Sequence, residues 1–109
     1  MAAESQMDQR SELGVKRASE NDLHNATYSF TNEDHTLGNL LRNQIIKSKH
    51  VEFCAYSVPH PSEPVMNVRV QCHPTGHDTK KVLGHGLKRV IKMCDVLEEK
   101  FRAKLEEHE

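Results

Sequence analysis

The chain has 109 residues, of which 36% are hydrophobic and 28% are charged, and its 15 Lys and Arg residues nearly balance its 16 Asp and Glu residues. A chain of this length forms one domain with one modest hydrophobic core. The mean hydropathy is −0.72 and no stretch approaches the roughly 18 apolar residues of a membrane helix, which excludes a membrane span.

Residues 1–25 have the composition of a solvated tail. They are rich in Ser, Gln, Glu and other charged residues and show no sustained hydrophobic periodicity. Leu13 and Val15 are isolated among polar neighbours, so burial cannot offset the entropy lost when this segment becomes ordered. We expect a disordered polar tail over residues 1–25 and a folded domain over residues 26–109.

The fold is predicted to begin with a strand over residues 26–31, where apolar and polar residues alternate. A short helix follows, with either Asp34 or Thr36 suited to cap its amino end. We expect this helix to run to about residue 48. Its apolar positions follow the spacing i, i+3, i+4 and i+8, which places on one face Leu37, Leu40, Leu41 and Ile45.

Two further strands are predicted over residues 51–58 and 66–72. The first is rich in β-branched and aromatic residues, and it ends where Pro59 and Pro61 remove backbone donors. In the second, apolar and polar residues alternate, which indicates one buried and one polar face.

The carboxyl-terminal third carries the strongest pattern, an apolar stripe that recurs mainly at spacings of four and three. This stripe predicts one amphipathic helix of more than about twenty residues. Gly84 and Gly86 lie near its start, and each costs about 1 kcal/mol relative to Ala in a helix. Either the helix begins later or another element packs closely there. The stripe consists of Leu83, Leu87, Val90, Cys94, Leu97, Phe101 and Leu105.

The order β-α-β-β-α predicts an α+β fold with two helices on one face of a small antiparallel sheet. At 1.5 Å per residue the long helix spans roughly 30 Å or more, which exceeds what three short strands can cover. An exposed apolar stripe of that size usually marks an interface. We therefore expect the chain to be an obligate oligomer.

Eight His and three Cys residues suggest a metal site, but their spacing opposes it. The chain has no Cys-x-x-Cys motif, and a Pro and a Gly lie between His73 and His77. Cys54 and Cys72 fall at core positions, where cysteine behaves as a small hydrophobe. We expect neither a metal nor another cofactor, while a small zinc-binding protein or metal-dependent enzyme stays as an alternative.

No motif for catalysis stands out. The chain contains neither Gly-x-Ser-x-Gly nor a phosphate-binding glycine loop. Glu33, Asp34 and His35 have the composition of an acid–base group, but at a helix amino end such residues cap amides, and adjacent positions do not face each other across a site. No catalytic residue is predicted.

Nucleic-acid binding by the free chain is disfavoured. With no Trp, 2 Tyr and 3 Phe residues the chain offers few stacking platforms, and its net charge of −1 lacks the basic excess that phosphate contacts require. A basic patch on the polar face of the long helix is most simply a solvated face, although it could steer an acidic partner. This patch comprises Lys81, His85, Lys88, Arg89 and Lys92. An independent nucleic-acid-binding module is the second rival class.

Residues 30–42 are similar to the signature of the small alpha-like subunits of archaeal and eukaryotic RNA polymerases, and the resemblance extends over residues 27–105. Residues 52–54, 60–63 and 94–95 look most like the subunit shared by RNA polymerases I and III, with the polymerase II counterpart as the alternative. The residues of the family motif are Glu33, Asp34, His35, Thr36, Leu37, Gly38 and Asn39.

This resemblance implies an alpha-like dimerisation fold and a non-catalytic assembly subunit of DNA-directed RNA polymerases I and III, in the nucleus and nucleolus. Its helices would pack against those of a larger alpha-like subunit. The heterodimer would then be the platform for the two catalytic large subunits, including the second-largest, in transcription of ribosomal RNA, 5S RNA and tRNA. No direct contact with DNA or a membrane is expected.

The resemblance and the apolar pattern together predict the residues that bind the partner. They are Leu37, Leu40, Leu41, Ile45, Leu87, Val90, Cys94, Leu97, Phe101 and Leu105. The pattern does not divide them between the sheet and the partner. We further expect Gly38 to permit close approach of a helix. After the first helix the chain has Ser48-Lys49-His50, where family members often have an Asn-Pro or Asp-Pro turn.

Overall fold

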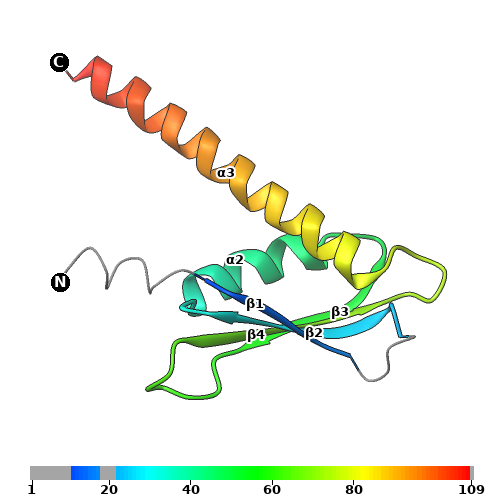
Figure 1. The fold of residues 1–109 in the computed structure, drawn as a ribbon. Coiled ribbons are helices and arrows are strands. Elements are labelled where there is room, and N and C mark those ends of the chain that lie inside the picture. The colour runs from blue at the N-terminus through cyan, green and yellow to red at the C-terminus, as the bar shows by residue number, and fades with distance from the viewer. Residues whose placement is uncertain (1–10, 18–21, 109) are drawn as a thin grey trace.

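A computed structural model describes residues 11–17 and 22–108, and these form a four-stranded antiparallel sheet with two helices on one face (Figure 1). The strands lie in the sheet in the order β1-β2-β4-β3. This arrangement confirms the predicted α+β class. Along the chain the elements are β1 (Leu13–Lys16), β2 (Asn25–Thr31), α2 (His35–Ile46), β3 (Val51–Ser57), β4 (Val65–Cys72) and α3 (Thr79–Glu107).

Strand β1 lies within the segment that we expected to be a disordered tail. It pairs antiparallel with β2, with Leu13 opposite Phe30 and Val15 opposite Tyr28. All four of its residues are exposed, so its order comes from backbone pairing with the edge of β2 and not from burial of its side chains. The expectation of a tail, and of three strands only, is therefore wrong for Leu13–Lys16. Residues 1–10 and 18–21 lie outside the described part of the chain.

The other three strands match their predicted ranges to within one residue. Along β2 and β4 each buried residue alternates with one that is less buried, as the alternation in the sequence predicts. The register between these strands pairs buried residues directly, with Tyr28 opposite Val68 and Phe30 opposite Met66. The buried alternate positions give the sheet one apolar face, on which both helices lie.

Both helices begin at an aspartate that caps the first turn. The Asp34 carboxylate accepts a hydrogen bond from the Thr36 amide at 2.9 Å, and the Asp78 carboxylate accepts one from the Lys81 amide at 2.8 Å. Of the two candidate caps for α2, Asp34 is the one used. The short turn after α2 closes with the Val51 amide donating to the Ser48 carbonyl at 3.2 Å.

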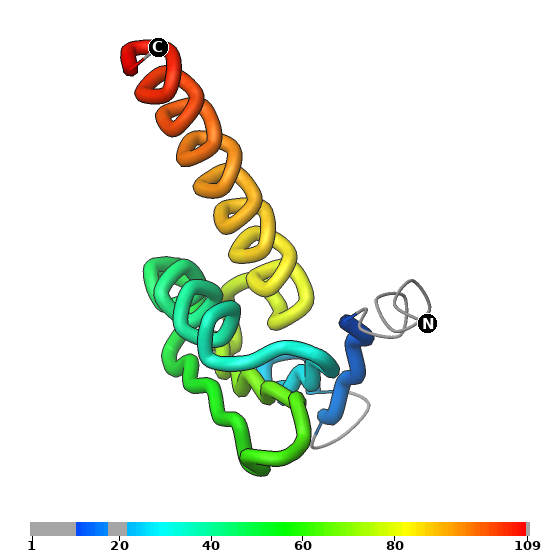
Figure 2. The backbone as a smooth tube through the Cα atoms, turned by 90° about the vertical axis from the view of Figure 1, so that its left-hand side faces the viewer, coloured from blue at the N-terminus to red at the C-terminus, as the bar shows by residue number. Residues whose placement is uncertain are grey.

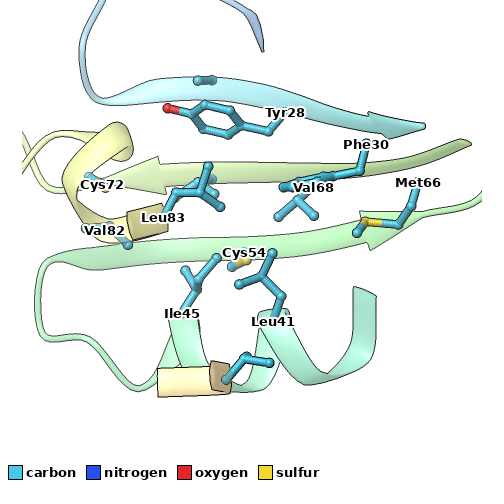
Figure 3. Close-up of a cluster of buried hydrophobic side chains, with 13 residues drawn as sticks. Tyr28, Phe30, Leu41, Ile45, Cys54, Met66, Val68, Cys72, Val82 and Leu83 are labelled. Atoms are coloured by element: carbon cyan, nitrogen blue, oxygen red, sulfur yellow. The ribbon is translucent and has the colours of Figure 1, made fainter. Parts of the chain in front are cut away.

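The hydrophobic core fills the space between the sheet and the helices (Figure 3). Leu41 and Ile45 of α2 point toward the strand that carries Cys54, and Leu83 of α3 lies over the sheet. Cys54 and Cys72 are buried in this core, as predicted for small apolar side chains. The hydroxyl groups of Tyr28 and Thr79 hydrogen-bond each other at 2.9 Å, which satisfies two buried polar groups.

Helix α3 begins at Thr79 and includes both glycines, so the alternative of a later start is wrong. A Cβ atom at Gly86 would lie 2.8 Å from Ile45 Cγ1, whereas one at Gly84 would meet nothing within 4 Å. Close packing of α2 against α3 thus accounts for Gly86 alone.

Beyond the core, α3 projects away from the sheet (Figures 1 and 2). The buried residues of α3 lie between Thr79 and Val90, and residues 91–107 are exposed. The second half of this helix therefore receives no cover from the sheet.

Candidate protein-binding surface

An uncovered apolar surface runs from α2 along the second half of α3. Leu97 is 69% exposed, Phe101 63% and Ile91 61%. Burying apolar surface stabilises a protein by about 25 cal/mol for each Å² removed from water, and these exposed side chains do not contribute that free energy. The exposed large apolar residues of the two helices are Leu40, Ile46, Ile91, Met93, Val96, Leu97, Phe101 and Leu105.

Between the two helices this surface deepens into a groove of about 560 Å³. Leu40 and Gln44 contribute from α2, and the remaining lining comes from successive turns of α3. The α3 lining consists of Arg89, Val90, Lys92, Met93, Cys94, Val96, Leu97 and Lys100. The groove presents mainly apolar atoms with cationic side chains around them.

The structure divides the predicted partner-binding residues into two groups. Leu41, Ile45 and Val90 are buried in the core, and Leu37 and Leu87 pack partly against it. Leu41 and Ile45 face only the chain's own core, which corrects the expectation that these two residues bind a partner, whereas Val90 also lines the groove and Leu37 and Leu87 are only partly buried. The exposed group retains that prediction, and it consists of Leu40, Cys94, Leu97, Phe101 and Leu105.

Sequence reasoning missed other residues of the apolar surface. Ile91, Met93 and Val96 of α3 and Ile46 of α2 are exposed large hydrophobics, but none of them falls at the apolar spacings that were used to predict the partner-binding residues. A partly buried helix usually has an apolar face wider than 100°. Counting residues adjacent to the apolar faces would have found Ile46, Ile91 and Met93, but not Val96, which lies about 100° around the helix from Leu97.

The predicted basic patch is divided by the fold. Arg89 joins the two helices, because its guanidinium donates a hydrogen bond to the Gln44 carbonyl at 3.2 Å. Arg89 and Lys92 line the groove. The remaining members line a separate shallow hollow on the outer side of α3, and they are Lys81, His85 and Lys88.

The residues of the family motif make contacts that hold the start of α2 against other parts of the fold, mainly β3. A Cβ atom at Gly38 would lie 2.5 Å from Tyr56 Cδ2, so the close approach at this glycine is to a strand residue and not, as expected, to a helix. A His35 ring nitrogen and the Tyr56 hydroxyl lie 3.1 Å apart in a hydrogen bond. Glu33 accepts a hydrogen bond from the Ser11 hydroxyl, while Thr36 and Asn39 are exposed. These contacts indicate a structural role for the motif.

Several histidines gather where the turn after α2 meets the loop before α3. The rings of His50 and His77 stack with centroids 3.8 Å apart, and the His77 amide donates to the His50 Nδ1 atom at 3.3 Å. Burial, and then the neighbouring His50, Lys81 and His85, lowers the pKa of His77. This stack ties the amino end of α3 to the end of α2.

The groups with metal-binding chemistry do not converge. Among residues 11–17 and 22–108, no three His, Cys, Asp or Glu side chains are grouped so that they could hold a metal ion. Stacked imidazole rings hold their lone pairs in parallel planes, which do not meet at one ion. Burial raises the pKa of the Cys54 thiol to about 11, which keeps it protonated and unreactive.

No helix within the described ranges combines the length and the apolarity that crossing a bilayer requires.

Residues 25–100 match the family model described as the RNA polymerase Rpb3/Rpb11 dimerisation domain. The chain belongs to this family. The matched segment runs from β2 into the second half of α3 and so includes both helices of the groove. The resemblance predicted from the motif at residues 30–42 is thereby confirmed.

Curated relatives share the name DNA-directed RNA polymerases I and III subunit RPAC2. The protein from Saccharomyces cerevisiae is 45% identical over 92 residues, which are 84% of this chain and 63% of that protein. The protein from Schizosaccharomyces pombe is 49% identical over 84 residues, 77% of this chain and 66% of that protein. The Danio rerio protein is 37% identical over 102 residues, 94% of this chain and 90% of that protein. The chain thus spans just under two thirds of the length of the two yeast relatives.

The fold is also similar to a solved archaeal structure. The crystal structure of DNA-directed RNA polymerase subunit L from Thermoplasma acidophilum has a TM-score of 0.71 to this chain at 20% identity. The match covers 89% of this chain and 91% of the archaeal one. This likeness confirms the predicted alpha-like dimerisation fold.

Proposed function

We propose that this chain is a non-catalytic assembly subunit of DNA-directed RNA polymerases I and III. The observation that carries the proposal is the exposed apolar surface of α2 and α3. The family to which the chain belongs is described as a dimerisation domain, which is consistent with a surface that binds a partner. The names of the curated relatives support the choice of polymerases I and III over the polymerase II counterpart. In this role the chain forms a heterodimer with a larger alpha-like subunit.

The second half of α3 explains why a partner is required. Residues 91–107 have no cover from the sheet, and an isolated helix of that length is marginal in water. A partner that buries Leu97 and Phe101 removes apolar surface from water and supports the helix at the same time. Folding of this half and binding are therefore coupled in our proposal.

The heterodimer then serves as the platform on which the two catalytic large subunits dock, with the second-largest polymerase subunit among its contacts. The polymerases that contain this heterodimer transcribe ribosomal RNA, 5S RNA and tRNA. The heterodimer is localised in the nucleus, including the nucleolus. The chain supplies neither a catalytic residue nor a cofactor, and it does not contact DNA directly. The parallel stack of His50 and His77 lends no support to the zinc-binding alternative.

Substitution of Phe101 by Asp tests this proposal. A carboxylate at this position would be desolvated without a partner in an apolar interface, at a cost of several kcal/mol. We expect Phe101→Asp to abolish co-purification with the larger alpha-like subunit of the same polymerase. The measurement is affinity purification of the tagged larger subunit after co-expression.

Gly84→Asp is the matched control. It introduces the same carboxylate on the same helix, at a position where a Cβ atom meets nothing within 4 Å. This variant is expected to co-purify like the unmodified chain. Undiminished co-purification of Phe101→Asp would contradict the proposed surface.

A further inference from the structure

Within the described ranges, no helix or strand covers the face of the sheet opposite α2 and α3 (Figure 1). In β2 and β4 the residues that alternate with the core residues point to this open face. The register aligns them in rows across the strands, and one row joins Lys16 of β1, Thr27 of β2 and Arg69 of β4. Lys16 and Arg69 are exposed. Two cations therefore flank a short hydroxyl side chain across three neighbouring strands.

The open face is hollowed around this row, with a volume of about 450 Å³. Thr27 and Ser29 form a floor of short side chains between the longer cationic ones. Gly14 lies opposite Ser29 in the next row and adds no side chain there. We call this feature the cationic hollow, and its lining consists of Lys16, Arg17, Asn25, Ala26, Thr27, Ser29, Asn67 and Arg69.

The charged side chains of the cationic hollow all have the same sign. Its lining contains three cations, Lys16, Arg17 and Arg69, and no carboxylate. Among the residues that the structure describes, none of these three takes part in an ion pair. Their charges are therefore available to a ligand.

Two carboxylates flank the hollow in sequence, and neither lines it. Glu12 comes before the opposite end of β1 from Lys16. Asp22 comes before β2, where it accepts hydrogen bonds from the His24 amide at 3.1 Å and from the Asn25 side chain at 3.3 Å. The described part of the chain thus does not neutralise the cationic hollow.

The chemistry of the lining favours an acidic peptide over a nucleic acid. Ammonium and guanidinium groups form strong hydrogen bonds with carboxylates. The Asn67 side-chain oxygen accepts from the Ser29 hydroxyl at 2.6 Å, which leaves the Asn67 amide N–H groups as further donors. No aromatic side chain lines the hollow, whereas proteins that bind single-stranded nucleic acid stack its bases on aromatic rings.

We propose that the cationic hollow binds an extended acidic segment of another protein, with carboxylates of that segment paired to Lys16 and Arg69. Two strand spacings of about 4.8 Å separate these residues in their row, and an extended segment places alternate side chains about 7 Å apart. Flexible Lys and Arg side chains can close the remaining difference. The inference goes beyond the proposed function, because the hollow and the groove of α2 and α3 lie on opposite faces of the sheet and can be occupied together.

Charge-reversed double variants test the inference. Lys16→Glu/Arg69→Glu, the row variant, reverses the two cations that flank Thr27. Lys80→Glu/Lys88→Glu, the outer variant, makes the same change in net charge at exposed residues in the hollow on the outer side of α3. The probe is a short fluorescent peptide of alternating Glu and Ser residues. The quantity to measure is its dissociation constant for the heterodimer, by fluorescence anisotropy.

At about 50 mM salt the row variant is expected to bind the peptide about tenfold more weakly than the unmodified heterodimer, and the outer variant within about twofold of it. Lys16→Gln/Arg69→Gln removes the charges without adding repulsion and should also weaken binding. At about 500 mM salt these differences should shrink, because screening weakens interactions between exposed charges. Circular dichroism of each heterodimer checks that the fold is retained.

Each failure has a distinct meaning. A row variant that binds as tightly as the unmodified heterodimer, or an unmodified heterodimer that does not bind the peptide, would overturn the inference and leave the proposed function intact. A larger loss in the outer variant would also overturn it, by placing the peptide on α3. Tighter binding of a single-stranded oligothymidylate that the row variant loses would assign the hollow to nucleic acid instead. If no heterodimer forms, the proposed function fails, and the same titration of the full chain alone decides the inference.

Discussion

At the scale of single residues, two glycines set how closely α2 packs between its neighbours. A Cβ atom at Gly38 would lie 2.5 Å from the Tyr56 ring, and one at Gly86 would lie 2.8 Å from Ile45 Cγ1. Both distances are shorter than those that real Cβ atoms show. Gly38 therefore lets α2 approach β3, and Gly86 lets α3 approach α2.

Gly38→Ala is predicted to destabilise the fold by about 1–3 kcal/mol, because the methyl group would force the Tyr56 ring to move within a packed site. Gly38→Leu should have a larger effect and lower the yield of heterodimer. Gly84→Ala is the control, expected to stabilise by about 1 kcal/mol since only helix propensity changes there. Urea unfolding of the heterodimer with the larger alpha-like subunit measures both effects. Equal unfolding midpoints for Gly38→Ala and the unmodified chain would count against this packing.

We predict that His77 makes the stability of the fold depend on pH. Burial and the neighbouring His50, Lys81 and His85 lower its pKa from the usual 6.5. Because the unfolded chain then binds the proton more tightly, this contribution is complete above pH 6.5 and decreases as the pH falls toward the folded-state pKa. We predict a lower urea midpoint for the heterodimer at about pH 5.5 than at about pH 7.5.

His77→Gln removes the titrating group and should make the midpoint less sensitive to pH across this range. The comparison needs only the difference between the two midpoints for each protein, so a uniform loss of stability in the variant does not affect it. If the variant retains the full difference, His77 is not its source.

At the scale of elements, strand β1 shows what hydrophobic periodicity does not predict. Its side chains are exposed. Its order depends on backbone pairing with β2, which lies further along the chain. Strands β2 and β4 and both helices have buried faces, and their periods of 2 and 3.6 therefore predicted them. Strand β3 has one buried residue and a register shift, and its β-branched and aromatic composition predicted it instead. Backbone pairing without burial leaves no such signal.

The sequence predicted that helix α3 exists and is long, but it did not predict where the helix begins or where the sheet stops covering it. The apolar stripe continues unchanged from Leu83 to Leu105, although Leu83 is 3% exposed and Leu105 is 50% exposed. The boundary depends on where the sheet ends beneath the helix, which is a tertiary property. The sequence thus predicts that some of the stripe is free, while the fold decides which residues those are.

At the scale of the whole molecule, the sheet and the two helices enclose one hydrophobic core. The second half of α3 extends beyond the sheet (Figure 2), and its apolar side chains are exposed. The core buries Leu41, Ile45 and Val90 and leaves Leu97 and Phe101 in water. A monomer gains nothing from the exposed half of α3, whereas a partner with a matching helix would bury it. In the proposed function, this division of one amphipathic helix between core and interface is what makes the chain an obligate assembly subunit.

The most direct test of this account is the molar mass in solution, measured by size-exclusion chromatography with light scattering. The chain is examined alone and after co-expression with the larger alpha-like subunit of the same polymerase. We predict a soluble one-to-one complex, with the lone chain aggregated or poorly folded. A lone chain that remains a stable monomer and does not associate with the larger subunit would contradict the account.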